Sequence, residues 1–220
     1  ALARRVLATM QGMDLYLGAV LFAFGAILAS FVGVVVARRA TGQGIVAGRS
    51  RCDVCGTTLP PSALVPVLSY VLTRGRARCC GARVPLAGPI SEAVLGVCCV
   101  FAYASLGPSI ALPFFLLALA TLLALVEYDL MHQILPPSFL VAFMLFAALA
   151  GFLAAPSASA FGRSALVGAA MAALFLILHY ASRGRFMGFS DAPLVFALAL
   201  LVGSAAIPGF AFSFWIGAVI

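Results

Sequence analysis

Two aspartates, Asp129 and Asp191, are the residues of this chain best suited to catalysis. Each lies at one end of a long apolar run, and the whole sequence holds only six acidic residues. An ionisable side chain in or beside a bilayer is costly unless it is paired, hydrated or neutral, so an acid placed there is a candidate for function. Two carboxyl groups held close together cannot both ionise, so one keeps a proton while the other activates water. The pair predicts aspartyl proteolysis.

A plainer interpretation exists for each acid near these runs. Asp191 ends a Gly-Phe-Ser-Asp segment at the start of an apolar run, where an aspartate can simply cap a helix. Asp129 comes shortly before a Pro-Pro pair that indicates a turn between two helices. Glu127 is most simply a loop residue just outside the hydrocarbon. Capping would be the better interpretation of Asp191 if it stood alone.

Rival catalytic groups are missing from the sequence. Neither His132 nor His179 comes with a serine in a G-x-S-x-G elbow, and isolated histidines beside apolar helices are more often structural. The two histidines are also too far apart to form the H-E-x-x-H motif of zinc proteases.

The cysteines form two groups. Cys98 and Cys99 lie in an apolar run and are expected in the core. The other four lie in an Arg-rich segment, where a paired-cysteine loop in a reducing compartment more often binds metal than forms a disulfide. Adjacent cysteines hinder tetrahedral coordination, so we expect weaker zinc binding than from two C-x-x-C pairs, or none. The candidate zinc ligands are Cys52, Cys55, Cys79 and Cys80.

The composition shows which elements must position these residues. Hydrophobic residues make up 65% of the 220 residues and charged residues only 9%, which is too apolar for a soluble domain. The apolar runs are continuous, which favours membrane helices of about 20 residues over a β-barrel with alternating strands. We predict an all-α, polytopic transmembrane bundle of about seven helices with one cysteine-containing cytoplasmic insert. The expected helices are 15–37, 89–106, 110–128, 138–155, 164–181, 191–206 and a last one from about 208.

Arginine placement predicts the orientation. The net charge of +7 comes from 13 arginines and no lysine, and eight of the arginines lie between residues 38 and 83. By the positive-inside rule this segment and the one around Arg183 and Arg185 face the cytoplasm, which puts Asp129 and Asp191 on the same face. Nucleic-acid binding is disfavoured because Tyr70 is the only aromatic residue among those arginines.

The chain divides into three expected parts. Residues 1–37 hold the first transmembrane helix, which is too long for a signal peptide and is followed by Arg38 and Arg39 as a stop-transfer signal. Residues 38–88 form an Arg/Cys-rich cytoplasmic loop domain. Residues 89–220 form a transmembrane aspartyl protease domain.

These features resemble the type IV prepilin leader peptidases, which are GxGD-type intramembrane aspartyl proteases, over nearly the whole chain. The first helix fits through Ala29-Ser30-Phe31, although Gly33 stands where that family usually has Asn. The insert carries the best match, in order and spacing: Ser50-Arg51-Cys52-Asp53-Val54-Cys55, Leu64 to Tyr70, Arg74-Gly75-Arg76, Cys80-Gly81 and Pro89 to Glu92.

The resemblance implies roles for particular residues. Asp129 matches the first catalytic aspartate of the family and Asp191 the second. Gly188 fits the family's Gly-x-Gly-Asp motif, whereas Ser190 replaces its second glycine and Pro193 an expected lysine. Ser190 is expected to tighten the loop that aims Asp191.

Further departures are Pro137, which replaces an Asp after the first motif, and Ala77, which stands where the third family cysteine would be. Cys79 is the candidate replacement for that cysteine. Members of the family usually continue further at the C-terminal end, so the chain is expected to be a fragment or a short member.

The implied function is cleavage of the basic leader from type IV prepilin or pseudopilin-like precursors, at the cytoplasmic face of the bacterial inner membrane. Many members also methylate the new N-terminus with S-adenosylmethionine. Proteolysis would need no cofactor, and zinc would be structural. The alternative is a catalytically inactive membrane scaffold or zinc-binding module of a pilus or secretion machine, with Ser190 as the mark of lost activity.

Overall fold

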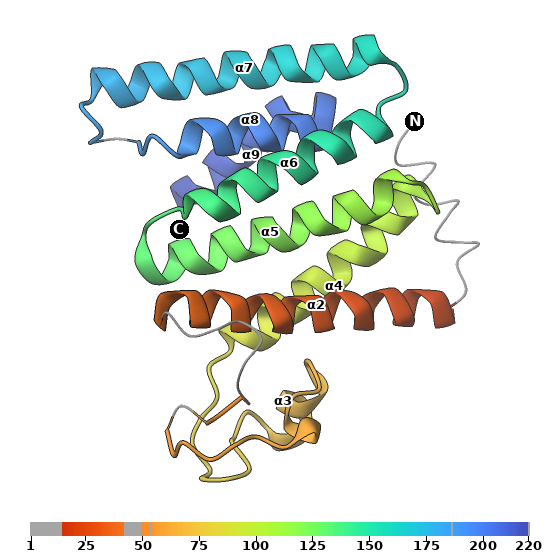
Figure 1. Cartoon of the computed structure of the whole chain (residues 1–220), viewed down its shortest axis with the longest axis vertical. Coiled ribbons are helices and arrows are strands. Elements are labelled where there is room, and N and C mark those ends of the chain that lie inside the picture. Colours follow the sequence, from red (N-terminus) through yellow and green to blue (C-terminus); the bar gives the residue numbers. More distant parts are fainter. Residues whose placement is uncertain (1–14, 42–49, 53, 186, 220) are drawn as a thin grey trace. The chain divides into compact units, whose positions relative to one another are not determined.

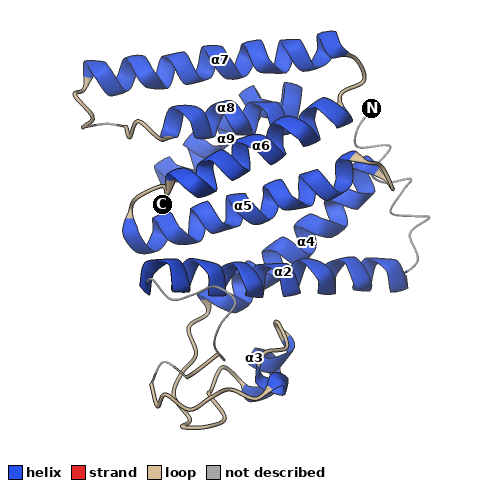
Figure 2. Cartoon of the chain, viewed as in Figure 1, coloured by secondary structure: helices blue, strands red, loops and turns tan. Residues whose placement is uncertain are grey.

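The computed structural model describes residues 15–41, 50–52, 54–185 and 187–219, and this part of the chain is helical with no named strand (Figures 1 and 2). The all-α prediction is confirmed. Arg4, Arg5, Asp14, Arg49 and Asp53 lie outside the described residues. The elements are α2 (Leu15–Thr41), η1 (Pro61–Ala63), α3 (Leu68–Thr73), α4 (Ala87–Leu106), α5 (Ala111–His132), α6 (Pro137–Ala154), α7 (Ala158–Ala181), α8 (Asp191–Val202), η2 (Gly203–Ala205) and α9 (Ala206–Val219).

Five of the described helices, α2, α4, α5, α6 and α7, are long and apolar enough to cross a membrane. Helix α8 has only 12 residues, which is short of the roughly 20 needed to span the hydrocarbon. The predicted continuous helix over 191–206 is wrong in this detail, because Gly203 adopts φ +60° and ends α8 at Val202. A glycine tolerates that conformation without strain.

Local capping explains where the other boundaries differ from the prediction. Helix α7 begins at Ala158 rather than 164 because the hydroxyl of Ser157 accepts a hydrogen bond from the Ala160 N–H at 3.2 Å. Helix α6 begins with Pro137 at its first position, where a missing N–H is harmless. Helix α5 continues past 128 to His132, so Asp129 lies on its last turn.

The chain forms two compact units. Unit 1 comprises the residues up to Gly107 together with Val126–Gln133, and unit 2 comprises Pro108–Leu125 together with the residues from Ile134 onward. Helix α5 therefore contributes its first turns to unit 2 and its last turns to unit 1. Asp129 belongs to unit 1 and Asp191 to unit 2.

In unit 1, α2 packs against α4 through glycines. A Cβ on Gly25 would lie 2.7 Å from the sulfur of Cys99 and 2.7 Å from the carbonyl oxygen of Leu95. A Cβ on Gly96 would lie 2.8 Å from the ring of Phe22. These distances are too short for any side chain, so both glycines are needed for the close approach of the two backbones, as at many helix crossings in membranes.

This crossing gives a stability prediction. Gly96→Ala should lower the stability of the chain by about 1–3 kcal/mol because the added methyl forces α2 and α4 apart. Gly88→Ala, in the first turn of the same helix, is the matched control because nothing lies within 4 Å of a Cβ there. The control should be neutral or slightly stabilising. Thermal unfolding in detergent checks both, and equal melting temperatures for the two variants would contradict the crossing.

In unit 2, α8 lies between α6 and α7. The fully buried core contains Phe143 and Ala147 of α6 and Ala197 of α8. Small residues again allow close packing, because a Cβ on Gly151 would overlap the carbonyl of Leu200 and one on Gly168 would touch Ala199 at 3.0 Å. Helix α8, which begins at Asp191, is thereby fixed on two sides.

The insert between α2 and α4 is attached to α4 by a hydrogen bond. The Val67 N–H donates to Glu92 Oε2 at 2.7 Å, so the start of α3 is held beside the second turn of α4. Val67 itself has φ 58° and ψ −51° and is the centre of a γ-turn in which the Leu68 N–H donates to the Pro66 carbonyl. A positive φ at a β-branched residue is strained.

Candidate functional site

Asp129 is presented at the C-terminal end of α5. Its carboxylate is exposed, and no described residue forms a hydrogen bond or ion pair with it. Beyond it the helix stops at Gln133, which has φ 54° and donates its N–H to the Asp129 carbonyl at 2.7 Å. The ring of His132 lies 4.5 Å from that of Tyr128 and belongs to the same last turn. Asp129 is therefore free to contact water or a substrate.

Asp191 is the first residue of α8, and the helix cap proper is Ser190, whose hydroxyl makes no capping hydrogen bond. Asp191 Oδ2 instead accepts a hydrogen bond from the Gly188 N–H at 2.8 Å. This bond closes a tight turn through the Gly-Phe-Ser-Asp segment and fixes the direction of the carboxylate. One of its two oxygens is engaged in the turn, and the structure gives the other no partner among the described residues.

His179, at the end of α7, supports the loop that leads to Asp191. Its Nδ1 lies 2.8 Å from the carbonyl oxygen of Met187, and its own carbonyl accepts the Gly184 N–H at 2.8 Å. Its ring also lies edge-to-face against that of Phe189, with centroids 6.0 Å apart. The sequence indicated only a structural histidine. The contact of His179 with the loop before Asp191 depends on a reversal of the chain after α7, and no sequence motif predicts this reversal.

Glu127 is a half-buried residue of α5 and does not lie in a loop. Its Oε2 would lie 3.8 Å from a Cβ placed on Gly33 of α2, and Ser91 and Glu92 of α4 are its polar neighbours. Glu127 therefore lies among the helices of unit 1, two residues before Asp129. The prediction that Glu127 is a loop residue is therefore wrong, because α5 continues past it to His132.

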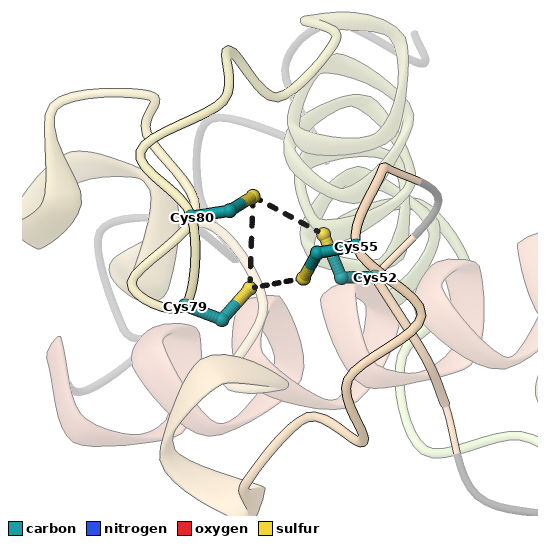
Figure 3. A group of neighbouring side chains, drawn as sticks. All are labelled: Cys52, Cys55, Cys79 and Cys80. Atoms are coloured by element: carbon teal, nitrogen blue, oxygen red, sulfur yellow. Dashed lines mark hydrogen bonds between the residues drawn. The ribbon is translucent and has the colours of Figure 1, made fainter.

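The structure brings together all four cysteines of the insert. Their sulfur atoms lie within 4.8 Å of one another and point toward a common centre (Figure 3). Sγ–Sγ distances are 3.7 Å for Cys52 and Cys80, 3.3 Å for Cys55 and Cys79, and 3.9 Å for Cys79 and Cys80. Tetrahedral zinc with Zn–S bonds of about 2.3 Å needs sulfur atoms about 3.8 Å apart. Four thiol groups at these distances fit a structural zinc ion, which would hold the two halves of the insert together.

Adjacent cysteines do not prevent this convergence, contrary to the geometric objection drawn from the sequence. The first pair lies on a turn in which the Gly56 N–H donates to the Cys52 carbonyl at 2.8 Å and the Cys52 N–H to the Thr57 carbonyl at 2.9 Å. The same two bonds recur in the second turn, where the Gly81 N–H donates to the Ala77 carbonyl and the Ala77 N–H to the Ala82 carbonyl, both at 2.8 Å. Both glycines have positive φ.

The two turns therefore match position by position. Ala77 occupies the place of Cys52, and Cys80 the place of Cys55. Cys79, one residue before Cys80, still directs its sulfur into the cluster and supplies the thiol that Ala77 lacks. This arrangement supports the prediction that Cys79 replaces the missing cysteine.

Hydrogen bonding within the cluster gives the thiol groups different pKa values. Bonds with the hydroxyl and the backbone N–H of Thr57 lower the pKa of Cys55 to about 6. Hydrogen bonds to Cys55 and Cys52 raise the pKa of Cys79 to about 12, because its proton is shared with their sulfur atoms. One sulfur of the cluster is thus already poised as a thiolate, the form in which cysteine binds metal.

Comparison with known proteins now identifies the family. Residues 23–106 match the model of the bacterial peptidase A24 N-terminal domain. A prepilin leader peptidase/N-methyltransferase of Bacillus subtilis is 32% identical over 203 residues, which cover 91% of this chain and 80% of the relative. The chain belongs to the prepilin leader peptidase/N-methyltransferase family.

Other members of the prepilin peptidase family align with somewhat smaller shares of this chain. The protein of Myxococcus xanthus is 36% identical over 162 residues, which cover 73% of this chain and 47% of that relative. The protein of Klebsiella pneumoniae is 28% identical over 203 residues, with 87% of each chain covered. No solved structure gives a significant match.

Family membership agrees with the architecture of the described residues. The matched N-terminal domain includes most of α2, the cysteine cluster and α4. The alignment with the Bacillus relative is long enough to include both Asp129 and Asp191, whichever end it omits. Together with the five long apolar helices, membership in the prepilin peptidase family makes this a multi-pass membrane protein.

Proposed function

We propose that the chain is a membrane aspartyl endopeptidase that cleaves the basic leader from type IV prepilin or pseudopilin-like precursors. The observation that carries the proposal is the relation to prepilin leader peptidases over nine-tenths of the chain. Two features of the site support the aspartyl mechanism. Asp129 presents a carboxylate without a described partner at the end of α5, and the Gly188 N–H orients that of Asp191 at the start of α8.

The two carboxyl groups have different roles in peptide hydrolysis, one as general base and the other as general acid. In our proposal Asp191, already accepting one hydrogen bond, is the ionised partner and takes a proton from water as the water oxygen attacks the scissile carbonyl carbon. Asp129 begins protonated and donates its proton to the carbonyl oxygen. When the tetrahedral intermediate collapses, the C–N bond breaks and the proton held by Asp191 passes to the leaving nitrogen. As the carbonyl re-forms, the proton on its oxygen returns to Asp129. Both carboxyl groups are then back in their starting states.

Orientation of the chain follows from its arginines. We place the insert and both aspartates on the cytoplasmic face of the bacterial inner membrane, because the Arg-rich segments lie there under the positive-inside rule. A leader with basic residues would remain on that same face, so the scissile bond would reach the two aspartates without crossing the bilayer.

The remaining assignments concern cofactors. Methylation of the new N-terminus with S-adenosylmethionine is proposed from the names of the relatives, which pair leader peptidase with N-methyltransferase. Zinc bound by Cys52, Cys55, Cys79 and Cys80 would fix the insert and leave no open position for water, so it is structural. Proteolysis itself uses only carboxyl groups of the chain.

The proposal can be tested with the whole chain in lipid. The purified protein is reconstituted into vesicles and mixed with a prepilin precursor, and mass spectrometry follows the new N-terminus. We expect one cleavage between leader and mature segment, and slower cleavage of a control precursor whose leader lysines and arginines are replaced by glutamine. A folded, zinc-loaded chain that releases no more leader than empty vesicles would instead support an inactive scaffold, in which Ser190 marks the loss of activity.

A further inference from the structure

A cationic pocket lies in the insert, and neither the candidate aspartates nor the cysteines line it. It is a hollow of about 390 Å³ lined by Tyr70, Arg74, Arg76, Arg83, Val84 and Leu86. The three arginines are exposed, and no described residue forms an ion pair or hydrogen bond with their guanidinium groups. Their charges are therefore available to a ligand.

The backbone forces two of these arginines together. Arg76 and Arg83 face each other across an antiparallel bridge, and the Val84 N–H donates to the Gly75 carbonyl at 2.9 Å beside it. Like charges directly opposite each other in such a pair are destabilising. The repulsion disappears when an anion lies between the two guanidinium groups, and arginine binds phosphate oxygens in a forked, two-bond geometry.

An uncovered apolar face adjoins the pocket in the sequence. Between Leu64 and Leu72 five large apolar side chains of α3 and of the turn before it are exposed, with Val71 at 63% and Leu72 at 64%. The others are Leu64, Val65 and Leu68. The insert is not a membrane span, and exposed apolar side chains near a basic site are typical of segments that lie in the membrane interface.

Two connections place both features at the membrane end of the insert. Leu86, at the edge of the pocket, directly precedes the long apolar helix α4. The hydrogen bond from the Val67 N–H to Glu92 holds the start of α3 beside the second turn of the same helix. The pocket and the apolar face are thus attached to the point where α4 leaves the bilayer.

We propose that the insert rests on the membrane surface through the apolar face of α3 and binds the phosphate of an anionic phospholipid headgroup in the arginine pocket. Val84 and Leu86 would contact the first part of the acyl chains, and the phosphate would lie between Arg76 and Arg83. This interaction orients the insert on the bilayer and does not depend on the proteolytic activity.

Lipid binding is measured on the whole chain in detergent by native mass spectrometry, with phosphatidylglycerol or phosphatidylcholine added. A near-surface arginine contributes about 1 kcal/mol to binding an anionic lipid, so Arg76→Gln with Arg83→Gln should weaken phosphatidylglycerol binding about 30-fold. The control pair Arg51→Gln with Arg78→Gln removes the same charge from the insert without touching the pocket, and should leave binding nearly unchanged.

Three outcomes would overturn the proposal. The control pair could weaken binding as much as the pocket pair, which would mean that only net charge matters. Phosphatidylcholine could bind as tightly as phosphatidylglycerol. Millimolar inorganic phosphate could displace the lipid completely, which would make the pocket a site for free phosphate. Unchanged zinc content in each variant shows that the insert has kept its fold.

The apolar face is tested separately in lipid nanodiscs by hydrogen exchange. The backbone amides of α3 should exchange more slowly in discs with phosphatidylglycerol than in discs with phosphatidylcholine alone, and Leu72→Asn should abolish the difference. Val54→Asn is the control, since Val54 is also highly exposed, at 71%, but lies in the first cysteine turn. Equal exchange of α3 in both kinds of disc would refute membrane docking.

Discussion

Asparagine at position 129 or 191 should reduce leader cleavage about a thousandfold or more, with little change in stability. The substitution keeps the shape of the side chain but removes the proton acceptor or donor that the mechanism needs. Groups that act as a unit are strongly non-additive, so the variant with both substitutions should be about as inactive as either single variant. Initial rates of leader release, measured by mass spectrometry on vesicle-bound protein, give all three values.

Asp14→Asn provides the chemical control, because Asp14 is an aspartate that precedes α2 in the chain and has no proposed role. Its rate should stay within about threefold of that of the parent. The aspartyl mechanism is wrong if Asp129→Asn or Asp191→Asn processes prepilin as fast as the parent. If the rate loss of the double variant equalled the product of the two single losses, the two residues would act independently. That result would also contradict a shared proton.

Removal of Cys52 and Cys55 together, as serines, should eliminate bound zinc. The parent should hold one zinc ion per chain, since four sulfur atoms converge within 4.8 Å. Elemental analysis of purified protein measures the metal directly. Cys98→Ser is the matched control, because Cys98 lies in α4 and outside the cluster.

The position of the Cys79 sulfur allows a more specific test of the zinc site. Cys79→Ser alone should weaken zinc binding about 10- to 100-fold or more, and adding Ala77→Cys should restore it, because Ala77 occupies the place of Cys52 in the matching turn. Failure of Ala77→Cys to restore zinc would show that the two turns are not equivalent. Zinc loss that abolished cleavage in a still-folded chain would argue for a catalytic metal and against a purely aspartyl mechanism.

The sequence predicted the existence and type of the long helices well and their ends less well. Continuous apolar runs determine where a helix can cross the bilayer, and the starts at Leu15, Ala111 and Asp191 follow them closely. The ends depend on single local bonds. The Ser157 cap lets α7 begin before Arg163, earlier than predicted. The positive φ of Gly203 ends α8 within the range that was predicted as one helix.

The candidate site was predictable in part for a similar reason. Residue types and their order predicted Asp129 and Asp191 as the catalytic pair and the four cysteines as a metal site, but not how the second cysteine turn is built. Nothing in a Cys-Cys pair shows that Ala77 and Gly81 repeat the hydrogen bonds of Cys52 and Gly56. The contribution of His179 to the Asp191 loop likewise depends on a backbone carbonyl, that of Met187, whose position no side-chain pattern encodes.

Val67 makes the attachment of the insert metastable. A residue held in such a backbone conformation stores about 1–3 kcal/mol, and a hydrogen bond to a charged carboxylate contributes about 1.5–3 kcal/mol, so the two nearly balance. While Glu92 accepts the Val67 N–H, the γ-turn persists and α3 stays beside α4. Without this acceptor the strain at Val67 would not be offset, so the γ-turn would relax and the start of α3 would no longer be held beside α4.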